Sequence, residues 1–138
     1  ATTEIYTVSL HDALPILGQG DGNAKEARGE LGRDAQIGVT CHASRHLAME
    51  AGDNGADYVA FGAFFPSSTK QTEHQAGIDL IEWWAGLFEI PCVAIGGITP
   101  ENCRPLVEAG ADFLAVSGAV WNGDEAAAVR AFAEVLRA

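Results

Sequence analysis

The chain has few basic residues, since eight Lys and Arg stand against nineteen Asp and Glu, and its formal net charge is −11 at pH 7. This balance disfavours nucleic acid or an anionic membrane as the main partner. A phosphate-bearing ligand would need local help from backbone N–H groups, a single lysine or a metal ion. The sequence therefore predicts small-molecule partners, with neither nucleic acid nor membrane.

Long apolar runs are also missing, because none reaches the roughly 18 residues of a membrane span. The three cysteines, Cys41, Cys92 and Cys103, are odd in number and have no C-x-x-C spacing. This pattern suggests neither a disulfide framework nor a zinc site. We interpret them as reduced, small core residues of a cytoplasmic protein. A hydrophobic content of 48% in 138 residues is typical of one globular domain.

The first 16 residues (ATTEIYTVSLHDALPI) fit badly with the rest of the chain. They show some alternation between Ile5 and Leu10 that suits an edge strand. They also resemble a translated sequencing-adapter read-through. We hypothesise that residues 1–16 are a non-native or disordered segment and that residues 17–138 form the domain. An uninterrupted native gene that encodes the segment would contradict this hypothesis.

Short apolar runs alternate with helical patterns along the remaining chain. The runs are apolar on both faces, as in parallel strands that helices cover. We predict strands over 36–40, 57–64, 91–95 and 112–116. Apolar spacing and capping signals predict helices over 24–31, 44–50 with Ser44 as N-cap, 78–88, 99–110 with Thr99 as N-cap, and 124–137.

Two segments of the chain repeat each other closely. The run 55–63 (GADYVAFGA) matches 110–119 (GADFLAVSGA), and each follows a Glu-Ala-Gly helix end. Repeated strand–loop–helix units predict a β/α array. A closed eight-stranded barrel takes about 200 residues or more. About four units therefore predict an α/β fold that is either a partial TIM barrel or a smaller open sheet.

In such folds ligands bind at the carboxyl ends of the strands. The four strand ends each carry a glycine or a hydroxyl residue: Thr40, the loop 64–70, Gly96–Gly97 and the segment 116–118. Lys70 follows the loop 66–69, and no other Lys or Arg occurs between Arg45 and Arg104. A lone cation in an acidic chain favours an anionic ligand. Gly96–Gly97 and Ser117–Gly118 suit a phosphate cup, in which backbone N–H groups approach the ligand closely.

These motifs together resemble the thiamine-phosphate synthase family, specifically the second half of its (β/α)8 TIM barrel, strands five to eight. The resemblance covers residues 17–138. Its motifs are Gly18–Gln19–Gly20–Asp21, Gly38–Val39–Thr40–Cys41–His42, Pro66–Ser67–Ser68–Thr69–Lys70, Gly96–Gly97–Ile98–Thr99 and Val116–Ser117.

The resemblance implies a transferase that couples hydroxymethylpyrimidine pyrophosphate with thiazole phosphate, with Mg²⁺ as cofactor. Asp21 then matches a magnesium ligand, and Thr40 and Lys70 match residues on the pyrophosphate, where they are the candidate catalytic residues. The remaining positions match the thiazole-phosphate site: Ser67, Ser68, Thr69, Gly97, Val116 and Ser117 around the phosphate, and Val93 and Ile95 along the thiazole.

The family's first half, which completes the pyrimidine and magnesium sites, has no counterpart in this sequence. We therefore expect the chain to have little or no activity by itself. One alternative is a thiazole tautomerase-like relative with a histidine like His42, although we favour a structural role for His42. Another is a non-catalytic, phosphate-binding half-barrel that self-associates through its open edges.

Overall fold

The computed structural model describes residues 16–66 and 76–137. Within these residues it contains one parallel sheet, in which each strand pairs with the next along the chain. The strands are β1 (Ile16–Leu17), β2 (Gly38–Thr40), β3 (Tyr58–Phe61), β4 (Cys92–Ile95) and β5 (Phe113–Ala115).

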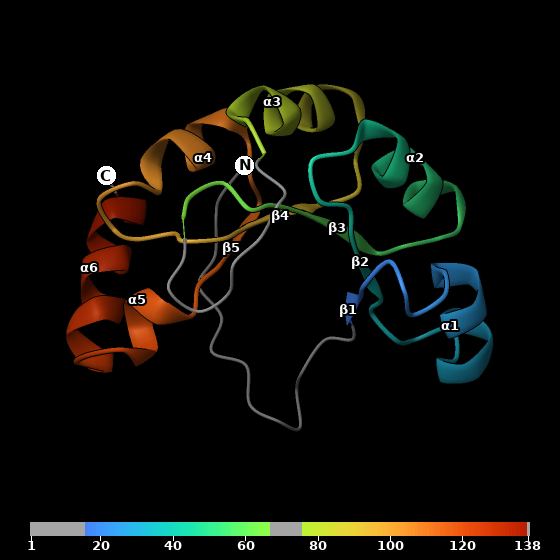
Figure 1. Cartoon of the computed structure of the whole chain (residues 1–138), viewed down its shortest axis with the longest axis horizontal. Coiled ribbons are helices and arrows are strands. Elements are labelled where there is room, and N and C mark those ends of the chain that lie inside the picture. The colour runs from blue at the N-terminus through green and yellow to red at the C-terminus, as the bar shows by residue number, and fades with distance from the viewer. Residues whose placement is uncertain (1–15, 67–75, 138) are drawn as a thin grey trace.

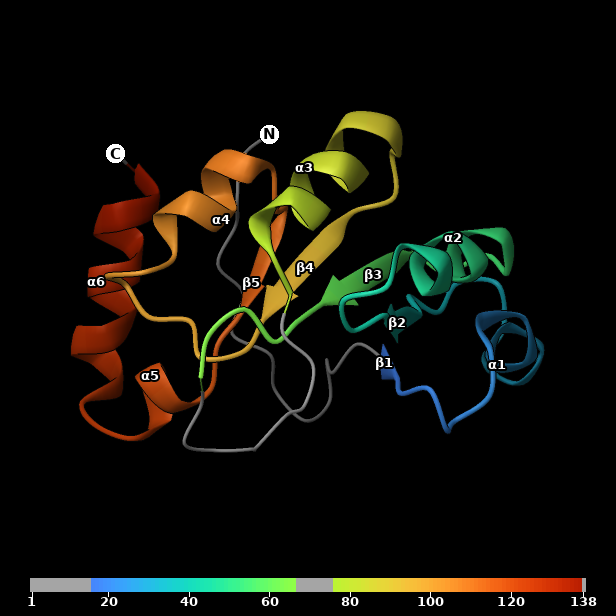
Figure 2. The ribbon, with the colours of Figure 1, turned by 45° about the horizontal axis from the view of Figure 1, so that its top comes forward.

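The helices lie along the outer, convex side of the curved sheet (Figures 1 and 2). A doubly wound sheet reverses its strand order and carries helices on both faces. Strands in chain order with helices on one side are instead the arrangement of a β/α barrel. The predicted partial barrel is confirmed. The helices are α1 (Ala24–Leu31), α2 (Arg45–Asp53), α3 (Ile78–Leu87), α4 (Arg104–Ala109), α5 (Gly118–Trp121) and α6 (Glu125–Arg137).

The strand register separates the two faces of the sheet. Val39, Val59 and Cys92 form one row across three strands, and all three are buried. Phe61 on the same face meets Trp84 of α3 edge to face, with ring centroids 5.9 Å apart. The core therefore lies between sheet and helices. The neighbouring row lies on the inner, concave face: Thr40, Ala60, Val93 and Phe113.

Local signals located most elements correctly. The predicted bounds of α1 hold, and Asn23 caps it by accepting the Glu26 N–H. Ser44 caps α2 as predicted, because its Oγ accepts the Leu47 N–H at 3.1 Å. The four predicted strands are present but shorter, since their ends pass into loops.

The prediction of Thr99 as a helix N-cap was wrong. The Thr99 N–H donates to Asn102 Oδ1 at 2.8 Å, and the Asn102 N–H donates to Thr99 Oγ1 at 3.2 Å. These reciprocal bonds close a separate turn, and α4 begins only at Arg104. Strand β1 and helix α5 were not predicted, because two and four residues are too few for a periodic pattern.

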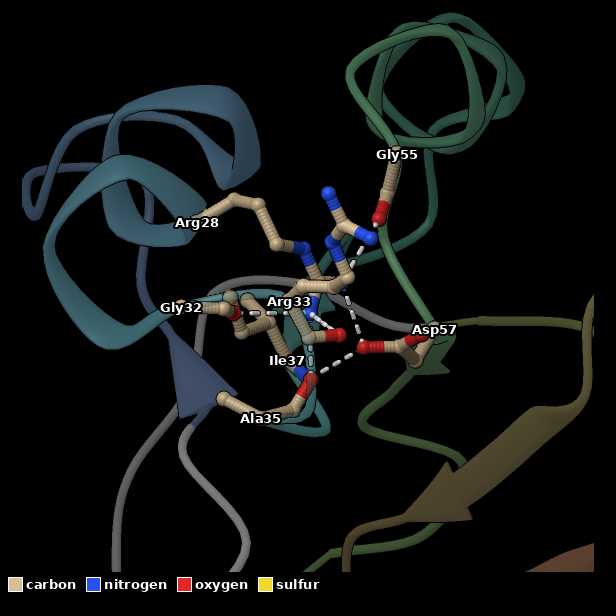
Figure 3. A network of polar contacts seen from close by, with 7 residues as sticks. All are labelled: Arg28, Gly32, Arg33, Ala35, Ile37, Gly55 and Asp57. Carbon is tan, nitrogen blue, oxygen red and sulfur yellow. Dashed lines mark hydrogen bonds and ion pairs between the residues drawn. The ribbon is translucent and has the colours of Figure 1, made fainter.

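Arg28 and Asp57 tie the amino ends of two strands together (Figure 3). Arg28 Nη2 lies 2.6 Å from Asp57 Oδ2, which also accepts the Ile37 N–H at 2.7 Å. Arg28 donates further to the carbonyl oxygens of Ala35 and Gly55. In β/α barrels the amino-terminal edge serves stability and the carboxyl edge serves chemistry. This network therefore belongs to the scaffold.

None of the helices in the described ranges combines the length and the apolar character needed to cross a membrane.

Candidate active site

The carboxyl ends of the strands meet at one edge of the sheet, because all strands are parallel and neighbours in chain order. Thr40 ends β2 and is half-buried. The Gly96–Gly97 pair follows β4, and Val116 and Ser117 follow β5. The structure thus brings residues from three separate sequence motifs to the edge at which barrel enzymes bind their ligands.

The loop after β1 is tied to the end of β2. Gly18 donates its N–H to Asp21 Oδ2 at 2.8 Å, and the Asp21 N–H returns a bond to the Gly18 carbonyl at 3.1 Å. Gln19 Nε2 donates to the carbonyl oxygen of Thr40 at 2.6 Å. Asp21 and Thr40 are therefore held in one unit. Gln19 stands inside the motif at residues 18–21, but no role was predicted for it, since glutamine at an exposed turn has no distinctive pattern.

Asp21 is exposed and supplies one carboxylate to this edge. Among residues 16–66 and 76–137, no three His, Cys, Asp or Glu side chains gather into a metal cluster. Mg²⁺ in proteins keeps several waters and often uses only one or two carboxylates together with substrate phosphates. The Asp21 carboxylate suits the role of one such ligand, and it does not form a magnesium site by itself.

The loops after β3 and β4 run against each other, backbone to backbone. Phe64 and Phe65 donate their N–H groups to the carbonyl oxygens of Ile95 and Gly96, at 3.2 and 3.1 Å. Gly97 has φ +63, and a Cβ there would lie 2.3 Å from the Pro66 carbonyl oxygen. Only glycine fits this position, for steric and conformational reasons together.

Val93 and Ile95 form an apolar part of the concave face. Along β4 they alternate with the buried Cys92 and Ala94, which face the helices. Val93 is half-buried, and Ile95 is 41% exposed. Their position next to Gly96–Gly97 suits the predicted contact with an apolar ring.

Ser117 lies at the start of α5 and is exposed. Its carbonyl oxygen accepts the N–H groups of Val120 and Trp121, at 3.1 and 2.9 Å. Its side chain makes no capping bond to that helix. The hydroxyl is thus not committed to the helix start, which suits the predicted role as a ligand donor.

Four predicted site residues, Ser67, Ser68, Thr69 and Lys70, lie outside the described residues. His42 is described, with φ +50, and its carbonyl oxygen accepts the Gly62 N–H at 3.2 Å. A left-handed conformation is uncommon for a residue with a side chain. His42 therefore has at least a structural role, in which its backbone joins the loops that follow β2 and β3.

The cysteines are core residues, as predicted. Cys41, Cys92 and Cys103 are buried and free. Burial raises the pKa of Cys41 to about 12 and the pKa of Cys92 to about 11. Because the thiolate is the nucleophilic form, these two groups are unreactive at neutral pH.

The fold and this edge define the class of protein: a segment of a β/α barrel, in which the loops at the carboxyl ends of the strands carry residues suited to binding a ligand. The chain is similar to the solved thiamine phosphate pyrophosphorylase from Pyrococcus furiosus, with a TM-score of 0.78 and 30% identity over 91% of this chain and 60% of that one. A 3-hexulose-6-phosphate synthase structure matches with a TM-score of 0.62 and 17% identity, covering 87% of this chain and 60% of that one. This second likeness concerns the fold alone.

A family model described as thiamine monophosphate synthase matches residues 15–120, and the chain belongs to this family. It is 73% identical over 124 residues to a thiamine-phosphate synthase of Erythrobacter litoralis, covering 88% of this chain and 58% of the relative. A thiamine-phosphate synthase of Rhodospirillum centenum is 58% identical over 123 residues, with 88% and 59% covered. The chain thus spans less than two thirds of the length of these relatives.

Proposed function

We propose that the chain forms one half of the active site of a thiamine-phosphate synthase. This transferase couples hydroxymethylpyrimidine pyrophosphate with thiazole phosphate. The observation that carries the proposal is the 73% identity to an enzyme of that name, over a stretch that includes the strand ends described above. In the reaction a carbon–oxygen bond to pyrophosphate breaks, and a carbon–nitrogen bond to the thiazole forms.

The second substrate is held at the ends of β4 and β5. The Gly97 backbone, Val116 and Ser117 take its phosphate, together with the hydroxyl residues 67–69. Val93 and Ile95 line the apolar ring. The phosphate then serves as a handle that fixes the ring nitrogen in line with the reacting carbon. This nitrogen carries no proton, so no general base is needed.

The first substrate's pyrophosphate lies toward β2. Lys70 places its positive charge next to the leaving group, and Thr40 adds a hydroxyl donor. Gln19 supports Thr40 through its carbonyl oxygen, at 2.6 Å. Bound Mg²⁺ would neutralise part of the charge that develops on the leaving pyrophosphate, with Asp21 as one ligand. Catalysis of this kind depends on positioning and electrostatic stabilisation.

The proposal includes low activity of this chain alone. Within the described residues, β1 and β5 each have one strand neighbour, so the sheet stays open at both edges. The concave face also leaves Ile95 41% exposed. A site that needs both halves of a barrel is incomplete in this arrangement.

An activity assay tests the proposal. The purified chain is given both substrates and Mg²⁺, in parallel with a fusion that adds the part of the Erythrobacter litoralis relative that the chain does not cover. We expect thiamine phosphate from the fusion and little or none from the chain alone. Turnover by the chain alone would refute its incompleteness, and a folded but inactive fusion would refute the proposed activity.

Lys70→Ala in the same fusion tests the assignment of the pyrophosphate site. Loss of a charge-assisted contact should weaken pyrophosphate binding about tenfold or more. Lys25→Ala is the matched control, because Lys25 is exposed on α1 and has no predicted role in the site. Equal pyrophosphate binding in both variants would contradict the role of Lys70 and favour the tautomerase-like alternative.

A further inference from the structure

The loop after β4 carries two successive peptide groups whose carbonyl oxygens are both held. The Gly96 carbonyl oxygen accepts the Phe65 N–H at 3.1 Å, from the loop after β3. The Gly97 carbonyl oxygen accepts a bond from Asn102 Nδ2 at 3.0 Å. Gly96 and Gly97 have φ values of +107 and +63, which suit glycine.

These two bonds decide where the following N–H groups point. In a trans peptide the C=O and the next N–H lie on opposite sides of the chain. Because Phe65 holds the Gly96 oxygen on the β3 side, the Gly97 N–H is directed to the other side, toward β5. Strand β4 lies between β3 and β5, and Ser117 follows β5. The Gly97 N–H and Ser117 therefore come from adjacent strand ends.

Asn102 controls the second peptide group. Glycine rotates freely about its backbone bonds, so an unanchored Gly97 would sample many orientations of the Gly97–Ile98 peptide. Asn102 removes this freedom by holding the Gly97 carbonyl oxygen, which directs the Ile98 N–H away from the turn. Consecutive N–H groups in a concave backbone segment form an anion-binding nest.

The Asn102 side chain is itself fixed in orientation. Its Oδ1 accepts the Thr99 N–H at 2.8 Å, while its Nδ2 donates to Gly97. Since the two partners are a donor and an acceptor, only one orientation of the amide satisfies both. The turn 99–102 thus acts as a rigid support behind the Gly97–Ile98 peptide.

We propose that Asn102 is a positioning residue for phosphate, acting through the Gly97 carbonyl oxygen to present the Gly97 and Ile98 N–H groups to the ligand. This inference deepens the proposed function and rests on it for the identity of the ligand, a phosphate monoester. It adds a residue whose side chain does not need to touch the substrate.

Three variants of the chain separate positioning from turn stability. Asn102→Ala removes the donor to Gly97 and the acceptor for the Thr99 N–H without adding charge, and it keeps the bond from the backbone N–H of residue 102 to Thr99 Oγ1. Asn102→Asp keeps the acceptor for the Thr99 N–H, loses the donor to Gly97 and adds a negative charge. Thr99→Val removes only the Oγ1 bond, which is internal to the turn. The readout is titration with inorganic phosphate, followed by the amide shifts of Gly97 and Ile98 in ¹⁵N spectra, with thermal unfolding as the check on folding.

We expect both Asn102 variants to bind phosphate about tenfold more weakly, as for one lost hydrogen bond to an oriented group. Thr99→Val should stay within about twofold, even where its unfolding temperature falls. If phosphate binding weakens in Asn102→Asp alone, the cause is the added charge. If it weakens in Asn102→Ala alone, the cause is the loss of the turn bond. Either result would overturn the proposal, as would unchanged binding in both.

The readout does not depend on catalysis, so an inactive fusion enzyme would leave this result standing. If phosphate shifts neither amide in the unsubstituted chain, the phosphate site at Gly97 is wrong, and the role of Asn102 fails with it. If phosphate binds normally in the unsubstituted chain and in both Asn102 variants, the role of Asn102 alone fails.

Discussion

Asp57 and Asp112 each tie together the amino ends of two neighbouring strands, β2 with β3 and β4 with β5, and they do so in the same way. The Asp57 N–H donates to the Ile37 carbonyl oxygen at 2.7 Å, and its carboxylate accepts the Ile37 N–H at 2.7 Å. Asp112 repeats both bonds with Cys92, at 3.1 and 3.0 Å. The Gly-Ala-Asp repeat seen in the sequence is therefore a repeated strand clamp.

Acid should weaken the Asp57 clamp. Burial by itself raises the pKa of Asp57. The hydrogen bonds from the Ile37 N–H and from Arg28, together with the attraction of the Arg28 charge, lower it by more, so the pKa of Asp57 is below its usual range. The carboxylate therefore adds stability above its ordinary pKa of about 3.9, and this contribution is lost as pH falls through the lowered pKa.

Asp57→Asn tests this by urea unfolding between pH 7 and about pH 2. We expect the variant to be less stable at pH 7 and to lose less stability in acid than the parent chain. Asp53→Asn, at the exposed end of α2, is the control and should leave the pH profile unchanged. An acid profile of Asp57→Asn parallel to that of the parent would contradict the clamp.

Gly97→Ala should destabilise the chain, while Gly86→Ala should stabilise it. A Cβ at Gly97 meets the Pro66 carbonyl oxygen at 2.3 Å in a left-handed backbone, whereas a Cβ at Gly86 meets nothing within 4 Å. We expect losses of about 1 to 3 kcal/mol at Gly97. At Gly86, inside α3, we expect a gain of about 0.5 to 1 kcal/mol. Urea unfolding measures the free energy of unfolding of both variants. Equal changes would show that the close contact between the loops after β3 and β4 does not contribute to stability.

The two adjacent tryptophans should differ sharply when each is replaced by phenylalanine. Trp84 is 1% exposed, and its Nε1 donates to the Ile90 carbonyl oxygen at 2.7 Å. Trp83 is half-buried, with the Arg45 guanidinium 4.8 Å from its ring centroid. Trp84→Phe should lower the free energy of unfolding by about 1 to 3 kcal/mol, because it leaves the Ile90 carbonyl oxygen unpaired and loses packing. Trp83→Phe should lower it by less than about 1 kcal/mol. The reverse order in chemical denaturation would show that the core is assigned to the wrong face of α3.

The thiols should be inert until the chain unfolds. Cys41, Cys92 and Cys103 are buried, and burial raises the pKa of each. We expect a chromogenic disulfide reagent at pH 8 to label none of them in the folded chain and all three in urea. Fast labelling of a single cysteine under native conditions would show that the region around it opens locally.

Local sequence determined much of the scaffold. Apolar runs and capping residues such as Asn23 and Ser44 located strands and helices, because these signals act over a few neighbouring residues. The Gly-Ala-Asp repeat and the strand order indicated a barrel segment. The motif resemblance named the family, which the comparisons confirmed. The roles of Asp21, Thr40 and Ser117 follow from that resemblance and stay predictions.

Only the tertiary structure decided how the strand ends are supported. The bonds from Gln19 to Thr40 and from Phe65 to Gly96 join residues that are 21 and 31 positions apart. No local periodicity reports such contacts, since they depend on which loops become neighbours at the edge of the sheet. The turn at 99–102 was missed for a related reason. Thr99 followed by Pro100 satisfies the local rules for a helix start, and the Asn102 bonds to Thr99 and Gly97 make it a separate turn instead.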